Sequence, residues 1–420
     1  MLTRTISVDS ATFARDHWNR RPLLSRAADL PADFDDLLST DAVDELIAQR
    51  GVRKPFIRMA KDGELLAGER YLSSAGFGAD MPDQIDSAKV LAEFAAGTTI
   101  VLQGLHRLWP PVIDFVAAMV ADLGHPVQAN AYITPASNRG FDPHYDVHDV
   151  FVLQTAGRKH WVVYEPVFVD PLPGQSWSTH RQAIEERSRE EPVIDAVLEP
   201  GDALYLPRGW IHAAQALGET SIHLTVGVSP VTVHDAVRAL IDELADSPQM
   251  RASLPMGVDF AASAQIRPIA EKALAAALDV VGSSSSDYAS AVADRLTWRH
   301  ADRTRPVAVR PLSTVAQLSS ITSDTVVGWR GGLVGELCEH DGVVDLRLRE
   351  KTITFPESCA RALDWLHAGH RGAAGSLPGL DSADGVVLAR RLLREAVVVI
   401  SESQRAPSDP AHVGESGRPE

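Results

Sequence analysis

The sequence has 420 residues, 45% hydrophobic and 23% charged, which is close to an ordinary soluble globular protein, and its length suggests about three domains. The formal net charge of −16 disfavours binding of nucleic acid over the average surface and favours basic partners. No run reaches the ~18 apolar residues of a membrane helix, the first residues carry no export signal, and two cysteines exclude a disulfide framework. We therefore expect a soluble, cytoplasmic protein.

The first 125 residues have mainly helical patterns. A short amphipathic helix near Phe13 is expected to end before Pro22, where an apolar strand begins. Apolar spacing and β-branched residues predict three further helices and one strand, namely helices at Asp41–Arg50, Lys89–Phe94 and Pro111–Leu123 and a strand at Thr98–Gln103.

The pattern changes to short strands between about Val127 and Pro230. The clearest strands are Gln128–Thr134, Phe151–Gln154, Trp161–Tyr164, Ala203–Leu206 and Ile222–Val228. Turns containing glycine or proline separate them, near Gly157, Gly201 and Gly209. Regularly spaced short strands predict a β-sandwich or barrel rather than βαβ units.

Helical spacing returns from Val231 to Leu278, where Val237, Leu240, Ile241 and Leu244 form an apolar stripe. Gly282–Ser286 is the best candidate for an internal linker or loop. The C-terminal third then predicts strands at Thr325–Trp329 and Val343–Arg349, helices at Pro356–His367 and Ser382–Glu395, and a strand at Ala396–Ile400. This order suits a small winged-helix-like domain, and the polar composition after Ser401 predicts a disordered tail.

The residues with the clearest chemistry are His144 and Asp146, which would share one face of a strand. An imidazole and a carboxylate there need one more histidine to form a 2-His-1-carboxylate triad, which binds ferrous iron and leaves positions for a chelating cosubstrate and oxygen. His148 would lie about 13 Å from His144 on a straight strand, too far to share an ion. His212, after a strand, a tight Pro-Arg-Gly turn and the start of a new strand, is the better third ligand.

Lys159 begins an apolar strand in a chain with few lysines, across an expected hairpin from the strand of Asp146. It can be an exposed hairpin lysine or a point charge inside the barrel that pairs with a ligand carboxylate. Asn130, Tyr132 and Thr225 would face the same region, where each can donate a hydrogen bond.

Together these residues resemble the ribosomal oxygenase branch of the JmjC, or cupin-4, dioxygenases. The resemblance rests on Asn130-x-Tyr132-x-Thr134-Pro135, His144-Tyr145-Asp146-x-x-Asp149-Val150-Phe151-x-x-Gln154, Gly157-x-Lys159-x-Trp161 and Leu206-Pro207-Arg208-Gly209-Trp210-Ile211-His212. Upstream, Trp18-x-x-Arg21-Pro22-Leu23-Leu24 and Leu102-Gln103-Gly104-Leu105-His106 also resemble this family. The similarity extends over roughly residues 10 to 400.

This resemblance implies an α+β protein built on a double-stranded β-helix (the JmjC/cupin barrel) that binds Fe(II) and 2-oxoglutarate and uses O2. His144, Asp146 and His212 would be both metal ligands and catalytic residues, and Lys159 would pair with the distal carboxylate of 2-oxoglutarate beside Asn130, Tyr132 and Thr225. The implied reaction couples oxidative decarboxylation to hydroxylation of an arginine or histidine in a ribosomal protein.

The expected organisation is a barrel with N-terminal elements over 1–230, a helical dimerisation region over 231–300, a winged-helix-like domain over 301–400 and a tail over 401–420. We expect a homodimer that does not bind membranes. Direct binding of nucleic acid is also not expected, since Arg390, Arg391 and Arg394 share their helix with Asp384 and Glu395. Two alternatives remain at this point: a hydroxylase of a peptide or small-molecule natural product, and a non-catalytic cupin-type DNA-binding regulator.

Overall fold

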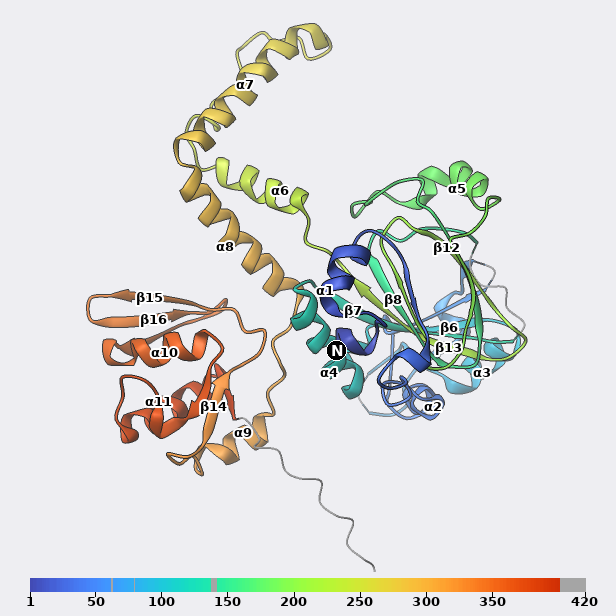
Figure 1. Cartoon of the computed structure of the whole chain (residues 1–420), viewed down its shortest axis with the longest axis horizontal. Coiled ribbons are helices and arrows are strands. Elements are labelled where there is room, and N and C mark those ends of the chain that lie inside the picture. The colour runs from blue at the N-terminus through green and yellow to red at the C-terminus, as the bar shows by residue number, and fades with distance from the viewer. Residues whose placement is uncertain (62, 79, 137–141, 401–420) are drawn as a thin grey trace, which may run out of the picture. The chain divides into compact units, whose positions relative to one another are not determined.

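The computed structural model describes residues 1–61, 63–78, 80–136 and 142–400 (Figure 1). The chain divides into two compact units, Met1–Leu296 and a second that begins at Thr297. Among the described residues, no helix is both long and apolar enough to cross a membrane. The tail predicted from Ser401 lies outside the described residues.

The N-terminal segment supplies helices that cover one face of a sheet. Its helices are α1 (Ser10–Thr12), a following π-turn (Phe13–His17), α2 (Thr40–Ala48), α3 (Ser87–Ala95) and α4 (Pro110–Leu123), and its strands are β1 (Leu23–Ser25), β2 (Ile57–Lys61), β3 (Glu64–Leu65), β4 (Leu72–Ser73), β5 (Gln84–Ile85) and β6 (Thr99–Leu102). Side-chain caps start several of these helices: Asp86 accepts hydrogen bonds from the backbone N–H groups of α3, and Ser39 does so for α2. The helices predicted at Asp41–Arg50, Lys89–Phe94 and Pro111–Leu123 and the strand predicted at Thr98–Gln103 form where expected, within two residues at their ends. The first helical segment ends at His17, earlier than the predicted stop at Pro22.

An eight-stranded antiparallel sheet forms the centre of the first unit, in the order β1-β11-β8-β13-β7-β6-β2-β3. Its later strands are β7 (Val127–Thr134), β8 (Asp149–Ala156), β11 (Ala203–Leu206) and β13 (Ser221–Val228). Alternate residues such as Ala131, Phe151 and Leu224 are buried against the N-terminal helices. The intervening residues, among them Val152, face the opposite side, which we call the inner face.

A second antiparallel sheet, β10-β9-β12, packs on the inner face. Its strands are β9 (Lys159–Tyr164), β10 (Ile194–Leu198) and β12 (Ile211–Ala216). Trp161 and Val163 contact Val152 and Leu204 of the large sheet, so an apolar core joins the two sheets. The result is the barrel-like pair of sheets that the strand pattern predicted.

The expected partner of the Lys159 strand was wrong. β9 pairs with β10 and β12, and not with β8, the strand that follows Asp146. Gly157 has φ +60° and lets the chain leave one sheet and enter the other. Gln154 secures this crossing, because its side-chain amide donates to the carbonyl oxygens of Ala156 and Gly157 at 2.9 and 3.0 Å.

Replacing Gly157 with alanine is expected to destabilise the protein by about 2–4 kcal/mol. An added Cβ would lie 2.0 Å from the backbone oxygen of Thr220, in a conformation that side chains disfavour. Chemical unfolding of the full chain measures the loss. Gly218→Ala is the matched control, since Gly218 has φ +78° but no atom within 4 Å of an added Cβ. Equal losses for the two variants would contradict the close contact at Thr220.

Helices complete the first unit. They are α5 (Arg181–Arg187) between β9 and β10, then α6 (Val233–Leu244), α7 (Ser263–Ser283) and α8 (Ser285–Arg303), which extends past the boundary of the unit. Helix was expected from Val231 to Leu278, but residues 245–262 form no helix. The expected linker at Gly282–Ser286 is instead largely helical, with only Ser284 between α7 and α8.

The second unit contains two three-stranded antiparallel sheets, β18-β14-β19 and β15-β16-β17. Its elements are α9 (Pro311–Leu318), β14 (Val326–Trp329), β15 (Glu336–His340), β16 (Val343–Arg347), β17 (Thr352–Pro356), α10 (Ala360–His367), β18 (Arg371–Ala373), α11 (Ser382–Arg394) and β19 (Val398–Ile400). Leu363, Leu388 and Val327 belong to its separate apolar core.

Candidate metal and cosubstrate site

Three of the predicted residues meet between the two sheets. His144 forms an isolated antiparallel bridge with His212 of β12, through backbone hydrogen bonds of 3.1 and 2.8 Å. The carbonyl oxygen of Asp146 accepts a hydrogen bond from the N–H of Gly209 at 3.0 Å. One ligand atom from each of His144, Asp146 and His212 lies within 4.8 Å of the others. The expected continuous strand through His144 and Asp146 is not formed, and this bridge positions the residues instead.

The ring orientations suit a shared metal ion. Nδ1 of His144 lies 2.8 Å from the carbonyl oxygen of Asp142, and Nδ1 of His212 lies 3.1 Å from that of Trp210. A carbonyl oxygen requires a donor, so each Nδ1 carries the proton and Nε2 is the ligand atom. Burial, with His144 nearby, lowers the pKa of His212 to about 4, so this imidazole is neutral. Two imidazoles and one carboxylate fit ferrous iron.

His148 takes a different place from the three clustered residues. Its ring packs over Gly227 of β13, where an added Cβ would lie 2.8 Å from Cδ2. A glycine at this position therefore leaves room for the imidazole. Burial raises the pKa of Asp146, but His212, His148 and His144 together hold it below the usual value.

A buried carboxylate shapes the turn before His212. Asp149 accepts a hydrogen bond from the backbone N–H of Arg208 at 2.8 Å, and burial raises the pKa of Asp149 to about 6. The Arg208 side chain donates to Oδ1 of Asn19 at 3.3 Å and lies 3.6 Å from Asp170. Asp149 and the Pro-Arg-Gly turn, which both belong to the motifs noted in the sequence, are therefore in direct contact. This contact holds the turn that leads into His212.

Lys159 is buried inside the barrel, with 5% of its surface exposed. Its Nζ donates to Oγ1 of Thr134 at 3.0 Å, and among the described residues no carboxylate lies within 4.0 Å of it. Burial lowers the pKa of Lys159 to about 7. An exposed hairpin lysine is therefore ruled out, and the geometry suits a ligand that brings its own negative charge.

The other expected residues share the inner face of β7 and β13. Asn130 lies opposite Thr225, and Oδ1 of Asn130 accepts from the backbone N–H of Gly104 at 2.9 Å. That bond ties the Leu102–His106 motif to β7, so one function of Asn130 is structural. Tyr132 lies opposite His223, and their rings stack with centroids 5.2 Å apart.

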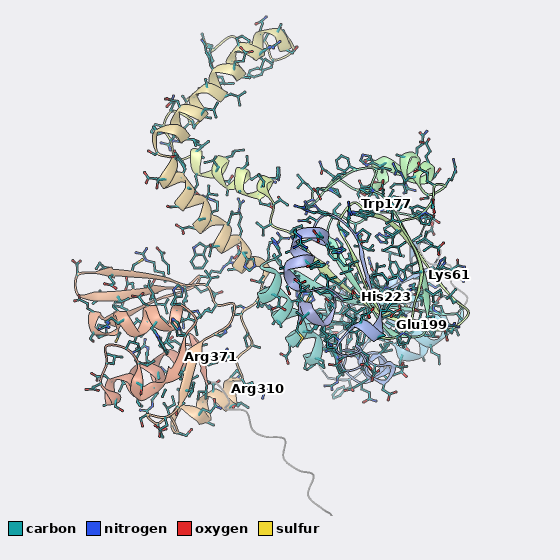
Figure 2. All side chains as sticks on the ribbon, in the orientation of Figure 1. Lys61, Trp177, Glu199, His223, Arg310 and Arg371 are labelled. Atoms are coloured by element: carbon teal, nitrogen blue, oxygen red, sulfur yellow. The ribbon has the colours of Figure 1, made fainter. Side chains whose placement is uncertain are left out.

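Sequence reasoning missed three residues here. Thr134 was noted only as part of a motif, whereas it contacts Lys159. His223 is buried, its Nδ1 has no hydrogen-bond partner among the described residues, and burial together with Lys159 keeps its pKa well below the usual value. Figure 2 places His223 within the β core and Trp177 beside α5. A polar residue within the apolar strand Ile222–Val228 was an available signal for His223.

Trp177 belongs to a segment between β9 and β10 that reaches the cluster of His144, Asp146 and His212. Its ring centroid lies 6.1 Å from that of His144, and the Arg181 guanidinium lies 4.5 Å from the indole. Tyr145, next to His144, donates to the carbonyl oxygen of Gln175 at 3.1 Å and anchors the segment. No local sequence pattern indicates this arrangement, because it depends on tertiary packing.

Part of the chain is similar to known oxygenases. A family model described as the JmjC domain matches residues 111–236. Ribosomal oxygenase 1 is 34% identical over 215 residues in Rattus norvegicus and 32% over 216 in Homo sapiens, and each alignment covers 51% of this chain. Bifunctional lysine-specific demethylase and histidyl-hydroxylase NO66 of Aedes aegypti is 30% identical over 220 residues. The chain covers only about a third of these relatives, 34%, 32% and 32% of their lengths.

A solved structure supports the same fold over almost the whole chain. YcfD, a ribosomal oxygenase from Escherichia coli crystallised with cobalt and 2-oxoglutarate, superposes with a TM-score of 0.50 at 18% identity. The superposition covers 94% of this chain and 99% of YcfD. The resemblance inferred from the motifs is thus confirmed for the fold: residues 111–236 match the JmjC domain, and the chain has a JmjC/cupin fold of antiparallel sheets and flanking helices.

Proposed function

We propose that this chain is an Fe(II)- and 2-oxoglutarate-dependent oxygenase that hydroxylates an arginine or histidine side chain of a ribosomal protein. The observation that carries the proposal is the cluster of His144, Asp146 and His212 beside the buried Lys159. The relatives named ribosomal oxygenase support the class of reaction and substrate.

In this proposal His144, Asp146 and His212 hold the metal through two Nε2 atoms and one carboxylate. When bound, Fe(II) with 2-oxoglutarate and O2 would supply the oxidising power for hydroxylation, with succinate and CO2 as the other products. The protein positions the ligands: the carbonyl oxygens of Asp142 and Trp210 fix the imidazole tautomers. The apolar core between the sheets restricts water.

Lys159 would pair with the distal carboxylate of 2-oxoglutarate, with Tyr132, Asn130 and Thr225 beside the cosubstrate. The charges at the two ends of 2-oxoglutarate support this assignment. One carboxylate ligand leaves a divalent metal site with a net positive charge, which suits the near end of a dianion. The Lys159 ammonium, which has no carboxylate partner among the described residues, would neutralise the far end.

The distribution of charge supports a basic protein substrate. The first unit, Met1–Leu296, has 25 basic and 40 acidic residues, and residues 297–400 have 13 and 12. Almost the entire net charge of −16 therefore belongs to the unit that carries the site. Such a surface attracts basic polypeptides such as ribosomal proteins and accelerates their encounter at low salt.

Intact-mass spectrometry of ribosomal proteins, from cells with and without the gene, tests the proposal. One protein should be lighter by one oxygen atom in the deletion strain, and the purified enzyme should restore that mass. Unchanged masses, together with 2-oxoglutarate turnover by the purified chain, would favour a peptide or small-molecule hydroxylase instead. Salt-dependent binding of duplex DNA without turnover would favour the cupin-type regulator.

We further propose the domain organisation expected from the sequence: a barrel over 1–230, a dimerisation region over 231–300 and a winged-helix-like domain over 301–400, in a cytoplasmic homodimer. The exposed apolar residues of the helical region support dimerisation. Val233, Val237 and Ile241 lie four residues apart along α6 and are 82%, 48% and 59% exposed. Leu274 and Leu278 of α7 are 66% and 74% exposed.

Replacing Ile241 with aspartate is expected to convert the homodimer to a monomer, because it would place a charge within a buried apolar contact. Light scattering after size exclusion should show the mass fall from about twice 45.3 kDa to 45.3 kDa. Leu312→Asp is the matched control, since Leu312 is 90% exposed on α9, outside residues 231–300. A monomeric wild type, or an Ile241→Asp dimer, would contradict this prediction.

A further inference from the structure

A row of side chains crosses the inner face of the large sheet towards the site. Arg58 of β2 lies opposite Val101 of β6, which in turn lies opposite Tyr132 of β7. The Arg58 neighbours Ile57 and Met59 are buried on the other face, against the helices. The half-buried Arg58 side chain passes over Val101, and its guanidinium donates to the hydroxyl of Tyr132 at 3.4 Å.

Arg58 lacks the partner that a structural arginine normally has. Among the described residues, no carboxylate lies within 4.0 Å of its guanidinium, and the bond to Tyr132 is the sole hydrogen bond of its side chain. Its Nε is buried and has no hydrogen-bond partner there either. Burying this N–H group without a partner costs free energy, so stability does not explain an arginine at this position.

The contact determines what the Tyr132 hydroxyl can do. A guanidinium can only donate, so the hydroxyl oxygen accepts and its proton is directed to another acceptor. No acceptor for that proton is present among the described residues. Burial raises the pKa of Tyr132, although Arg58 acts in the opposite direction, so the hydroxyl stays protonated. The ring is fixed by stacking on His223.

Tyr132 lies between two parts of the site. Asp146 is close enough to influence the pKa of Tyr132, and Thr134, two residues along the same face of β7, contacts Lys159. The hydroxyl proton is therefore available between the three clustered residues and the buried ammonium of Lys159. A dicarboxylate that spans these two groups would present oxygen acceptors there.

We infer that Arg58 is a positioning residue for the cosubstrate: it holds the Tyr132 hydroxyl as a hydrogen-bond donor towards a carboxylate oxygen of 2-oxoglutarate. The guanidinium acts through Tyr132 and does not itself bind the ligand. This inference rests on the proposed function and adds to it a residue outside the motifs that define the site.

Calorimetric titration of 2-oxoglutarate into the full-length, Mn(II)-loaded protein tests this role. Arg58→Gln should raise the Kd about fivefold and Tyr132→Phe about tenfold, as expected for loss of a hydrogen bond to a charged group. The double variant, Arg58→Gln with Tyr132→Phe, should also raise the Kd only about tenfold, because Arg58 has no effect without the hydroxyl. Arg58→Lys keeps a cationic donor and should recover most of the affinity. Arg53→Gln, which removes only the ion pair with Asp83, is the control.

Thermal unfolding and Mn(II) affinity, measured on every variant, separate positioning from misfolding. In steady-state turnover, Arg58→Gln should raise KM for 2-oxoglutarate and leave kcat unchanged. Unchanged affinity in Arg58→Gln, or a double variant weakened about fiftyfold, would overturn the positioning role. If the wild-type protein bound no 2-oxoglutarate, the proposed function itself would fail.

Discussion

Replacing Asp146 with alanine is expected to abolish iron-dependent turnover of 2-oxoglutarate and to weaken metal binding by about 100-fold or more. Asp146 supplies the only carboxylate of the three-residue cluster, with one oxygen 3.8 Å from Nε2 of His212. Two neutral imidazoles alone would bind a divalent cation weakly and without charge compensation. Titration with Co(II), followed by its visible absorption, measures binding, and succinate formation measures turnover.

His148→Ala is the matched control for this experiment. His148 follows Asp146 by two residues but packs over Gly227 rather than joining the cluster. Its loss should leave Co(II) affinity within about threefold of wild type, since no ligand is removed. Full turnover in Asp146→Ala would eliminate the triad. Loss of Co(II) binding in His148→Ala would instead assign His148 to the ligand set in place of His212.

The strand pattern between Val127 and Val228 was predictable because alternation reports burial directly. Phe151 and Leu224 face the helices while Val152 faces the second sheet, so each strand has two distinct sides. β12 was expected only as a new strand after the Pro-Arg-Gly turn, without an end, because Ala213 and Ala214 have low strand propensity. Pairing with β9 makes this segment a strand, and that pairing is not local in sequence.

The same distinction separates the site residues that were predicted from those that were missed. His144, Asp146 and His212 were found because metal chemistry restricts both residue type and spacing. The prediction of the strand that pairs with the Lys159 strand was wrong, since the single glycine at 157 decides between a hairpin and a crossing to the other sheet. Trp177 reaches His144 only through the packing of its segment on Tyr145, which local patterns do not encode.

Replacing Lys159 with alanine is expected to raise the Kd for 2-oxoglutarate about 100-fold or more, with little effect on metal affinity. Removing one partner of a buried ion pair costs about 3–5 kcal/mol, because the other charge stays buried and unpaired. The lysine is buried and bonds only to Thr134 among the described residues, so its loss would leave the distal carboxylate without its proposed partner. Calorimetry on Mn(II)-loaded protein measures the loss, and equal affinity would show that Lys159 does not contact the cosubstrate.

The pKa of Lys159 adds a pH dependence to this contact. Burial lowers it from 10.5 to about 7 without ligand, and a bound carboxylate would raise it again. Below pH 7 the lysine is already protonated, so affinity should be constant. Above pH 7 binding must take up a proton, so the Kd should rise by up to tenfold per pH unit. At pH 8, about 0.9 proton should be taken up per 2-oxoglutarate bound.

Calorimetry in two buffers of different ionisation enthalpy measures this uptake directly, with Mn(II) kept saturating so that the metal ligands do not contribute. Lys159→Arg is the control, because a guanidinium keeps its charge throughout this range and should remove the proton uptake. A pH-independent Kd in the wild type would mean that the lysine is charged before binding. It would then need a counter-ion in the ligand-free protein, whereas its one hydrogen bond among the described residues goes to the neutral hydroxyl of Thr134.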